Sequence, residues 1–275
     1  MSDTRSILIT GCSSGIGYAC AHGMKERGWR VLATARKKQD IERLESEGLE
    51  VLALEYRDAR SIKRCAEEAL KRTDGKLTAL FNNGAYGQPG AVEDVPVDAL
   101  REQFEANFFG WHDLTCRIVP AMRKQGHGRI VQCSSCLGLV SLKYRGSYNA
   151  SKFALEAMSD AMRQELAETD IHVSQIEPGP IETRFIENSL AAYRANIDLA
   201  ASAHAEIYKQ RIAAMEEGGT TMFKLGPEAV LEKLIHALES PRPRAHYYVT
   251  TATHLLAWGR RLFSTRILDR LVASQ

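Results

Sequence analysis

The chain has 275 residues, and its 36 lysines and arginines nearly balance its 34 aspartates and glutamates, which leaves a formal net charge of +2. A nucleic-acid binder normally carries a much larger basic excess, so this balance disfavours nucleic acid and favours a small molecule as partner. The six cysteines form no spaced framework, no apolar run approaches the ~20 residues of a membrane span, and the N-terminus shows no secretory cleavage pattern. We therefore expect a cytoplasmic protein with reduced thiols.

Short apolar runs alternate with longer helical patterns along most of the chain. Such alternation predicts a parallel sheet with helices on both faces. Because the runs continue at similar spacing past the midpoint, we predict a single α/β domain over residues 1–275, a doubly wound, Rossmann-like sheet of about seven strands. The predicted strands are 6–10, 30–34, 50–54, 77–82, 129–134, 171–177 and 246–250.

The first predicted strand runs into the glycine-rich stretch TGCSSGIG and then into a helical pattern. Glycines let the backbone turn tightly and approach a pyrophosphate, which the free N–H groups and the dipole of a helix start stabilise. The spacing differs from the G-x-G-x-x-G fingerprint, and a glycine-rich turn without a ligand is the alternative. The candidate phosphate-binding residues are Gly11, Ser13, Ser14, Gly15, Ile16 and Gly17.

The end of the second predicted strand indicates which dinucleotide binds. Ala35 stands where an acidic residue would accept a hydrogen bond from the ribose of NAD, and Arg36 follows it. An arginine there suits the 2′-phosphate of NADP. A solvated basic helix start is the alternative, although cations are unfavourable at a helix N-terminus. We therefore expect NADP(H) as the cofactor.

Tyr148 and Lys152 lie four residues apart in SYNASKFALEAM, a stretch without glycine or proline. This spacing predicts that both side chains share one face of a helix. Tyrosine and lysine occur at this spacing on many ordinary helices, so the pair alone does not distinguish packing from proton transfer.

Several short motifs follow one another in a fixed order along the chain. They are T-G-x-x-x-G-I-G from Thr10, Asn82-Asn83, Ser135, Tyr148-x-x-x-Lys152 and Pro178-Gly179. In this order they resemble the short-chain dehydrogenase/reductase family over about residues 5 to 250. Within the family the chain is most similar to NADP-dependent aldehyde reductases and to related steroid and retinol dehydrogenases.

The resemblance implies a catalytic group. Tyr148 would be the proton donor, Ser135 would orient the carbonyl, Lys152 would stabilise the phenolate and bind the nicotinamide ribose, and Asn107 would position the lysine through water. A cation at ~4 Å and an effective dielectric of ~20 interacts by about 4 kcal/mol, so Lys152 could lower the pKa of the phenol by roughly three units, toward 7.

The resemblance also implies further cofactor contacts. They are Asn83, Gly84, Pro178, Gly179, Ile181 and Thr183, with Glu55 where many relatives carry an aspartate that meets the adenine. The family usually reads N-N-A-G, whereas this chain has Gly84 before Ala85. The exchange moves the flexible residue one place toward the strand and leaves the backbone path there open.

An Ala-rich segment with periodic apolar residues, 185–217, interrupts the alternation after the sixth predicted strand. At the carboxyl edge of the sheet such an insertion suits a substrate lid, which we place at about 185–225; a helical pair that only pads the core is the alternative. Phe185, Ile186, Leu190, Tyr193, Ile197 and Leu199 could turn an apolar face toward the nicotinamide. Neither Arg184 nor Arg194 falls in an apolar context, so we expect apolar substrates.

Other patterns leave alternatives open. Cys133 and Cys136 form C-x-x-C, but a disulfide there would compete with Ser135, so a redox role is disfavoured. The eight histidines show no metal-ligand spacing, so we predict no metal site. The amphipathic segment at about 254–272 would more often close a core or a subunit contact than lie on a membrane. A homodimer or homotetramer is the default expectation.

The sequence therefore predicts an NADPH-dependent carbonyl reductase for apolar aldehydes or ketones. A same-class alternative is an NADP-linked alcohol, steroid or retinol dehydrogenase running in the oxidative direction. A different-class alternative is a non-catalytic NADP-binding regulatory protein, which would not require Ser135, Tyr148 and Lys152 together.

Overall fold

The computed structural model describes residues 5–219 and 222–272. Its strands form one parallel sheet in the order β3-β2-β1-β4-β5-β6-β7, and each strand boundary lies within two residues of the predicted one. The doubly wound α/β prediction is thereby confirmed. The strands are β1 Ser6–Ile9, β2 Arg30–Ala35, β3 Glu50–Ala53, β4 Ala79–Asn82, β5 Gly128–Cys133, β6 Ile171–Glu177 and β7 His246–Tyr248.

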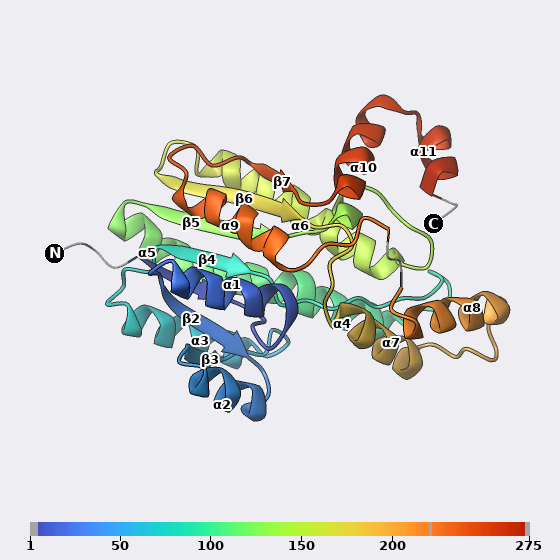
Figure 1. The fold of residues 1–275 in the computed structure, drawn as a ribbon, viewed down its shortest axis with the longest axis horizontal. Coiled ribbons are helices and arrows are strands. Elements are labelled where there is room, and N and C mark those ends of the chain that lie inside the picture. The colour runs from blue at the N-terminus through green and yellow to red at the C-terminus, as the bar shows by residue number, and fades with distance from the viewer. Residues whose placement is uncertain (1–4, 220–221, 273–275) are drawn as a thin grey trace.

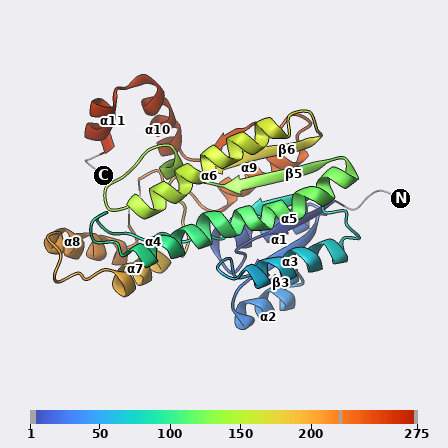
Figure 2. The ribbon, with the colours of Figure 1, turned by 180° about the vertical axis from the view of Figure 1, so that it is seen from behind.

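Helices cover both faces of the sheet. Helices α1 and α9 pack on one face (Figure 1), and α3, α5 and α6 cover the other (Figure 2). Because both faces are covered, central strands are apolar at consecutive positions, as in Ile7, Leu8 and Ile9, all fully buried. The main helices are α1 Gly15–Glu26, α2 Lys38–Ser46, α3 Ala59–Arg72, α4 Val97–Phe104, α5 Gly110–Gln125, α6 Gly146–Glu165 and α9 Glu228–Glu239, with short turns η1 Glu105–Phe109 and η2 Cys136–Gly138.

The strand order reverses direction at β1, which has β2 on one side and β4 on the other. In an open parallel sheet, loops leave such a point in opposite directions and open a crevice at the carboxyl ends of the strands. The glycine-rich turn follows β1 and the Asn82-Asn83 pair ends β4, so both motifs meet at this point.

Helices α7 Phe185–Asn196 and α8 Ala205–Glu216 lie beyond the carboxyl edge of the sheet, beside α4 (Figure 1). Tyr193, Tyr208 and Ile197 are buried there in a second small core, which Ile186, Leu190 and Leu199 flank. The predicted apolar face therefore packs mostly against α8 and the 91–95 loop, while the Phe185 ring contacts the Tyr148 ring at a centroid distance of 5.3 Å. Residues 220 and 221 of the predicted lid lie outside the described part.

Helices α10 Thr251–Leu262 and α11 Thr265–Val272 project from the same end of the sheet (Figure 1). Leu255, Trp258 and Leu262 share one face of α10, and between 60% and 69% of each residue's surface is exposed. The opposite face of α10 is buried at Thr253, Ala257 and Gly259, so the helix packs on the described part of the chain by that face. Among residues 5–219 and 222–272, no helix combines the length and apolar character that crossing a membrane requires.

Candidate active site

The glycine-rich turn after β1 depends on backbone contacts that only glycine allows. Gly11 and Gly15 adopt φ angles of +70° and +57°, which side chains other than glycine rarely adopt. A Cβ atom on Gly11 would lie 2.5 Å from the Cα of Gly84, and one on Gly17 would collide with the carbonyl oxygen of Gly11. The turn is therefore packed directly against the backbone that follows β4.

The N-terminus of α1 meets the requirements of an anion site. Ser14 is its N-cap but makes no side-chain cap hydrogen bond, and the first turn contains no acidic residue. The N–H groups at the helix start and the positive end of its dipole are thus available to a phosphate. Ile16 packs partly against the core, and the carbonyl of Ser13 accepts a hydrogen bond from Arg43 at 2.8 Å. These residues fit a dinucleotide pyrophosphate.

The exchanged Gly84-Ala85 order is accommodated without backbone strain. Asn83 donates from its backbone to the Thr10 hydroxyl (2.7 Å) and from its side chain to the Thr10 carbonyl (3.0 Å). A Cβ atom on Gly84 would lie 3.2 Å from the Cα of Gly11, so the two loops are in close contact at this point. Ala85 is not one of the described residues with a positive φ angle, so its side chain is accommodated without that strain. The glycine is thus used for close approach of two loops, a role that the altered order preserves.

Arg36 follows β2 as predicted, and it contacts the predicted adenine-site residue Glu55 at 3.4 Å. Arg57 also pairs with Glu55, at 3.1 Å. Burial alone would raise the pKa of the Glu55 carboxyl, but the hydrogen bonds and charge of Arg57, aided by Arg36, lower it overall. Glu55 is therefore an ionised partner of two arginines at the edge of the cofactor crevice.

The loop after β6 closes the other side of the crevice. Thr183 lies against the glycine-rich turn, since a Cβ on Gly15 would be 2.8 Å from its methyl group. Pro178 accepts a hydrogen bond from the backbone of Cys136 (2.8 Å), which ties this loop to the segment carrying Ser135. Gly179 packs against Thr250, and Ile181 bridges to Leu225.

Lys152 is buried on α6, one turn after Tyr148. Its Nζ donates to the carbonyl of Cys133 at 2.8 Å and lies 4.3 Å from the centroid of the Trp111 ring. Burial lowers the pKa of Lys152 to about 8. The lysine thus keeps a large positive fraction at neutral pH and is held by β5 and α5.

Tyr148 lies beside Ser135, as predicted, but its electrostatics differ from the prediction. Burial raises the pKa of the phenol above its ordinary value of 10, although the Ser135 hydroxyl lowers it by hydrogen bonding. The expectation that Lys152 would bring this pKa toward 7 is wrong in this structure, because the ammonium donates to Cys133 and lies 5.8 Å from the centroid of the phenol ring. The hydroxyl of Ser135 also accepts from the backbone of Leu137 (3.1 Å).

Asn107 lies in the π-helical turn η1 and is fully buried. Its side-chain amide donates to the carbonyl of Tyr86 (2.8 Å) and to Ser151 (3.4 Å), the residue before Lys152. π-turns interrupt the regular helical hydrogen bonds and often occur at functional sites. The turn therefore places Asn107 against the helix that carries Tyr148 and Lys152.

Comparison with known proteins accounts for this arrangement. The family model described as short chain dehydrogenase matches residues 5–194. The chain belongs to the short-chain dehydrogenase family. It is 42% identical to the Escherichia coli K12 protein named uncharacterized oxidoreductase YbbO, over 98% of this chain and 94% of that protein.

Two further family members extend the comparison. The NADPH-dependent 3-dehydrocapnine reductase of Ornithobacterium rhinotracheale is 30% identical, over 97% of this chain and 95% of that protein. A short-chain dehydrogenase from Streptomyces avermitilis has a solved structure that superposes with a TM-score of 0.79 at 26% identity, covering 98% of this chain and 96% of that one. As a short-chain dehydrogenase, the protein is an oxidoreductase that acts on small molecules, and enzymes of the family typically use a nicotinamide cofactor.

Cys133 and Cys136 surround Ser135 but have the character of packed thiols. Both are free, and burial raises the pKa of each thiol to about 11. Thiol–disulfide exchange requires a thiolate, so these two side chains are poorly suited to it. Cys133 ends β5 and Cys136 begins η2, so the two cysteines fix the ends of the short segment that carries Ser135.

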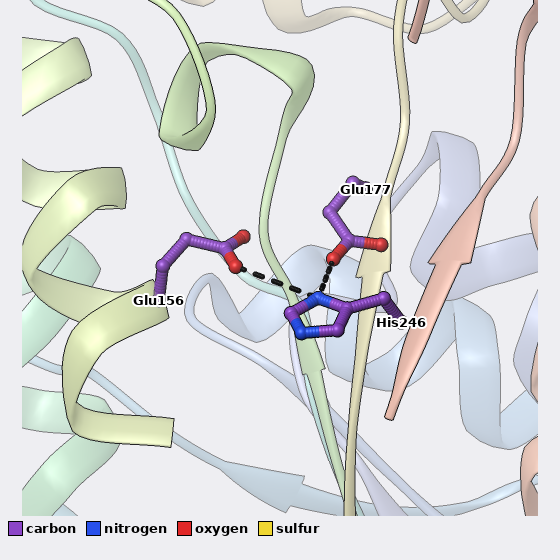
Figure 3. A group of neighbouring side chains, drawn as sticks. All are labelled: Glu156, Glu177 and His246. Carbon is purple, nitrogen blue, oxygen red and sulfur yellow. Dashed lines mark hydrogen bonds and ion pairs between the residues drawn. The ribbon is translucent and has the colours of Figure 1, made fainter. Parts of the chain in front are cut away.

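Behind Lys152 the fold gathers a polar cluster, Glu156, Glu177 and His246, which sequence reasoning missed (Figure 3). Nδ1 of His246 lies 2.6 Å from Glu177 and 3.8 Å from Glu156. The shorter distance is that of a direct hydrogen bond, with less space than two ligands of one metal ion require. Burial, reinforced by the Glu177 charge, raises the pKa of Glu156 to about 8. The three side chains come from α6, β6 and β7, so no local motif could have predicted the cluster.

Trp111 is a second residue that the sequence gave no reason to select. Its indole N–H donates to the carbonyl of Gly84 (2.9 Å), while its ring lies under the ammonium of Lys152. One side chain therefore connects the backbone of the cofactor crevice with the lysine. In the sequence, only its position directly after A-N-F-F-G at residues 106–110 pointed to Trp111.

Proposed function

We propose that this short-chain dehydrogenase is an NADPH-dependent carbonyl reductase that acts on molecules with a substantial apolar part, with Tyr148 as proton donor. The observation that carries the proposal is the convergence of three groups, namely the Tyr148 phenol beside Ser135 and the buried ammonium of Lys152 one helical turn away. A regulatory protein that only binds the cofactor has no need of all three.

The nicotinamide, when bound, supplies the hydride, and this chain's residues handle the carbonyl oxygen and the proton. Ser135 would hydrogen-bond the carbonyl oxygen and hold it beside Tyr148. The phenol, kept protonated by its raised pKa, would donate its proton to that oxygen as negative charge develops. Lys152 would stabilise the phenolate that remains. Asn107, through Ser151, would hold the helix that positions the lysine.

The preference for NADP(H) rests on the end of β2. Arg36 offers an exposed guanidinium beyond the strand, and the neighbouring Ala35 brings no carboxylate that would repel a 2′-phosphate. Gly11, Gly15 and Gly17 would admit the pyrophosphate, with Asn83, Gly84, Thr183 and Ile181 forming the walls. The name of the Ornithobacterium relative, an NADPH-dependent reductase, supports the same choice.

An oxidative NADP-linked alcohol, steroid or retinol dehydrogenase is the second candidate. The same groups would serve it in reverse, with Tyr148 receiving the proton. The direction in the cell follows the ratio of reduced to oxidised cofactor, and the carbonyl panel below tests the reductive direction.

The proposal is tested by following NADPH consumption with a panel of aldehydes and ketones. Tyr148→Phe should reduce turnover by at least ~10²-fold while leaving the affinity for NADPH within a few-fold of wild type. Tyr248→Phe, which removes a hydroxyl from a tyrosine on β7, is the matched control and should retain activity. Near-normal turnover in Tyr148→Phe, or no carbonyl reduction by the wild type, would refute the assignment.

We also propose that α7 and α8 form the substrate lid of a single domain, and that the exposed face of α10 covers a subunit contact in a homodimer or homotetramer. Leu255, Trp258 and Leu262 would supply its apolar centre, and a membrane surface is the other partner that they could meet. Sedimentation of the wild type and Trp258→Asp separates the two: a loss of oligomer supports the contact, and a loss of binding to anionic vesicles supports the membrane.

A further inference from the structure

The N-terminal end of α6 meets the two lid helices in a group of aromatic and cationic side chains. The Tyr144 ring contacts the Tyr208 ring at a centroid distance of 6.0 Å, and Tyr208 contacts Tyr193 at 5.3 Å. Tyr144 itself has a φ angle of +60°, an uncommon conformation for a bulky residue. Arg145 follows it directly and stands three residues before Tyr148. The catalytic helix and the lid therefore share this group.

Two arginines of the group lack a carboxylate partner. The Arg211 guanidinium lies 4.5 Å from the centroid of the Tyr144 ring, a contact that uses its face and leaves its N–H donors unpaired. Within residues 5–219 and 222–272, neither Arg211 nor Arg145 forms an ion pair or a side-chain hydrogen bond. Both side chains are partly buried. Their donors are thus shielded from part of the solvent without protein acceptors in return.

The carboxylates on the surrounding elements have other partners. Asp94 accepts from Tyr208 and Ser202, and Glu93 lies 2.8 Å from His204. On the lid helices, the acidic residues Glu216 and Glu206 pair with Arg194 and Lys209. These four acids are thus engaged elsewhere, and within residues 5–219 and 222–272 no carboxylate forms an ion pair with Arg145 or Arg211.

The hydroxyl of Tyr193 provides an independent observation. Only 1% of this residue is exposed, and its hydroxyl oxygen is buried without a hydrogen-bond partner. The charges of Arg145 and Arg211 both act on this hydroxyl, and the charge of Arg145 also acts on the phenol of Tyr148. A buried hydroxyl and two cations without acids together form a surplus of hydrogen-bond donors, which an anion would satisfy.

We propose that Arg145, Arg211 and Tyr193 form an anion-binding subsite, and that the physiological substrate carries a carboxylate, sulfonate or phosphate on the same molecule as its carbonyl. The inference rests on the proposed reductase function and names its substrate class. The apolar side chains of the lid would cover the chain between the two groups. From the sequence only Arg184 and Arg194 were weighed, and these pair with Glu187 and Glu216; Arg145 and Arg211, which form the subsite, were not.

The first test compares matched substrates of the wild type. Straight-chain aldehydes of four to ten carbons are assayed beside the same aldehydes carrying a terminal carboxylate, sulfonate or phosphate. At one chain length or more, an anionic member should have a kcat/KM at least about tenfold above its neutral partner, mainly through a lower KM. The three end groups distinguish the kind of anion. If neutral members are better at every length, the inference is wrong.

The second test uses variants at the subsite. Arg211→Gln should remove most of the preference for the anionic members while leaving kcat/KM for neutral aldehydes within about twofold, and Arg211→Lys should restore part of it. Arg194→Gln, which removes a paired charge from α7, is the matched control and should retain the preference. An equal loss on both substrate types in Arg211→Gln would indicate a structural role only. Tyr193→Phe serves as a second variant if Arg211→Gln does not fold.

A binding measurement separates this inference from the proposed function. Calorimetry with octanoate and with octanol, in the presence of NADP⁺, needs no turnover. The wild type should bind octanoate at least about tenfold more tightly than Arg211→Gln does, with octanol binding unchanged. Octanoate binding that is equal in the two proteins would overturn the subsite even if carbonyls are reduced, and loss of reductase activity alone would not affect this result.

Discussion

The glycine-rich crevice and the proposed substrate lid, α7 and α8, are built in opposite ways. Around the crevice, backbone packs on backbone: a Cβ on Gly11 would come within 2.5 Å of Gly84, and the Thr10 hydroxyl accepts from the backbone N–H groups of Asn83 and Gly84, at 2.7 and 3.2 Å. The helices α7 and α8 instead pack side chain on side chain, and they leave the Tyr193 hydroxyl and the N–H donors of Arg211 without a protein acceptor among the described residues. Close backbone packing therefore fixes the shape of the crevice, whereas α7 and α8 retain unused hydrogen-bond donors.

The largest effect is expected from a substitution that places a methyl group in the crevice. Gly17→Ala would push a Cβ against the Gly11 carbonyl and within 2.7 Å of the Asn83 amide, which cannot move without displacing the turn. We expect NADPH affinity to fall at least about 30-fold, that is, by about 2 kcal/mol, together with a lower melting temperature.

Gly28→Ala is the control for that substitution. Gly28 has a φ of +80°, but no atom lies within 4 Å of the position that a Cβ would take. The substitution therefore introduces backbone strain alone, of about 1 kcal/mol. Fluorescence titration with NADPH measures both variants. Equal cofactor affinity in the two would mean that close packing does not define the crevice.

The cofactor preference tests the edge of the same crevice. Ala35→Asp combined with Arg36→Leu introduces an acceptor for a ribose hydroxyl and removes the cation, so the ratio of NADPH to NADH affinity should fall by about tenfold or more. Arg60→Leu, an exposed arginine at the start of α3, is the control and should leave the ratio unchanged. An unaltered ratio in the double variant would show that Arg36 does not face the 2′-phosphate.

A homologous aldehyde series tests the apolar lining of the proposed lid. Each buried methylene contributes up to about 0.8 kcal/mol, so kcat/KM should rise by up to about fourfold per carbon until the space under the proposed lid is filled. Phe185→Ala removes the ring that meets Tyr148 at 5.3 Å and should flatten the rise, whereas Ile207→Ala on the exposed side of α8 should not. A flat series in the wild type would contradict an apolar lining.

The smallest expected effect concerns the polar cluster behind the crevice. Burial raises the pKa of Glu156 to about 8, so the folded state keeps a proton between pH 4.5 and 8 that the unfolded state has lost. Stability from this group is therefore present below pH 4.5 and is lost as the pH rises through about 8. Glu156→Gln should lose less unfolding free energy between pH 5 and 8 than wild type, by on the order of 1 kcal/mol.

The exposed Glu165, on the same helix, provides the control for that slope. Glu165→Gln should follow the wild-type pH dependence in urea unfolding. Parallel curves for wild type and Glu156→Gln would indicate that the carboxyl is already ionised in the folded protein across this range.

Much of the fold and of the candidate site could be read from the sequence because their determinants are local. The alternation of apolar runs predicted all seven strands, and the spacing of Tyr148 and Lys152 placed both on one buried helical face, since i and i+4 always meet there. Glycines at fixed offsets marked the turn after β1. Such features depend on neighbours within a few residues, which the sequence displays directly.

Tertiary structure alone decided the electrostatics and the composition of the lid. Whether Lys152 lowers the pKa of Tyr148 depends on where its ammonium points, and the carbonyl of Cys133 on β5 takes its hydrogen bond. The Glu156–Glu177–His246 cluster joins elements that are far apart in the chain, and so does the proximity of Arg145 to Arg211. Burial and charge interactions depend on distances through space, and a linear pattern carries no information about those until the chain has folded.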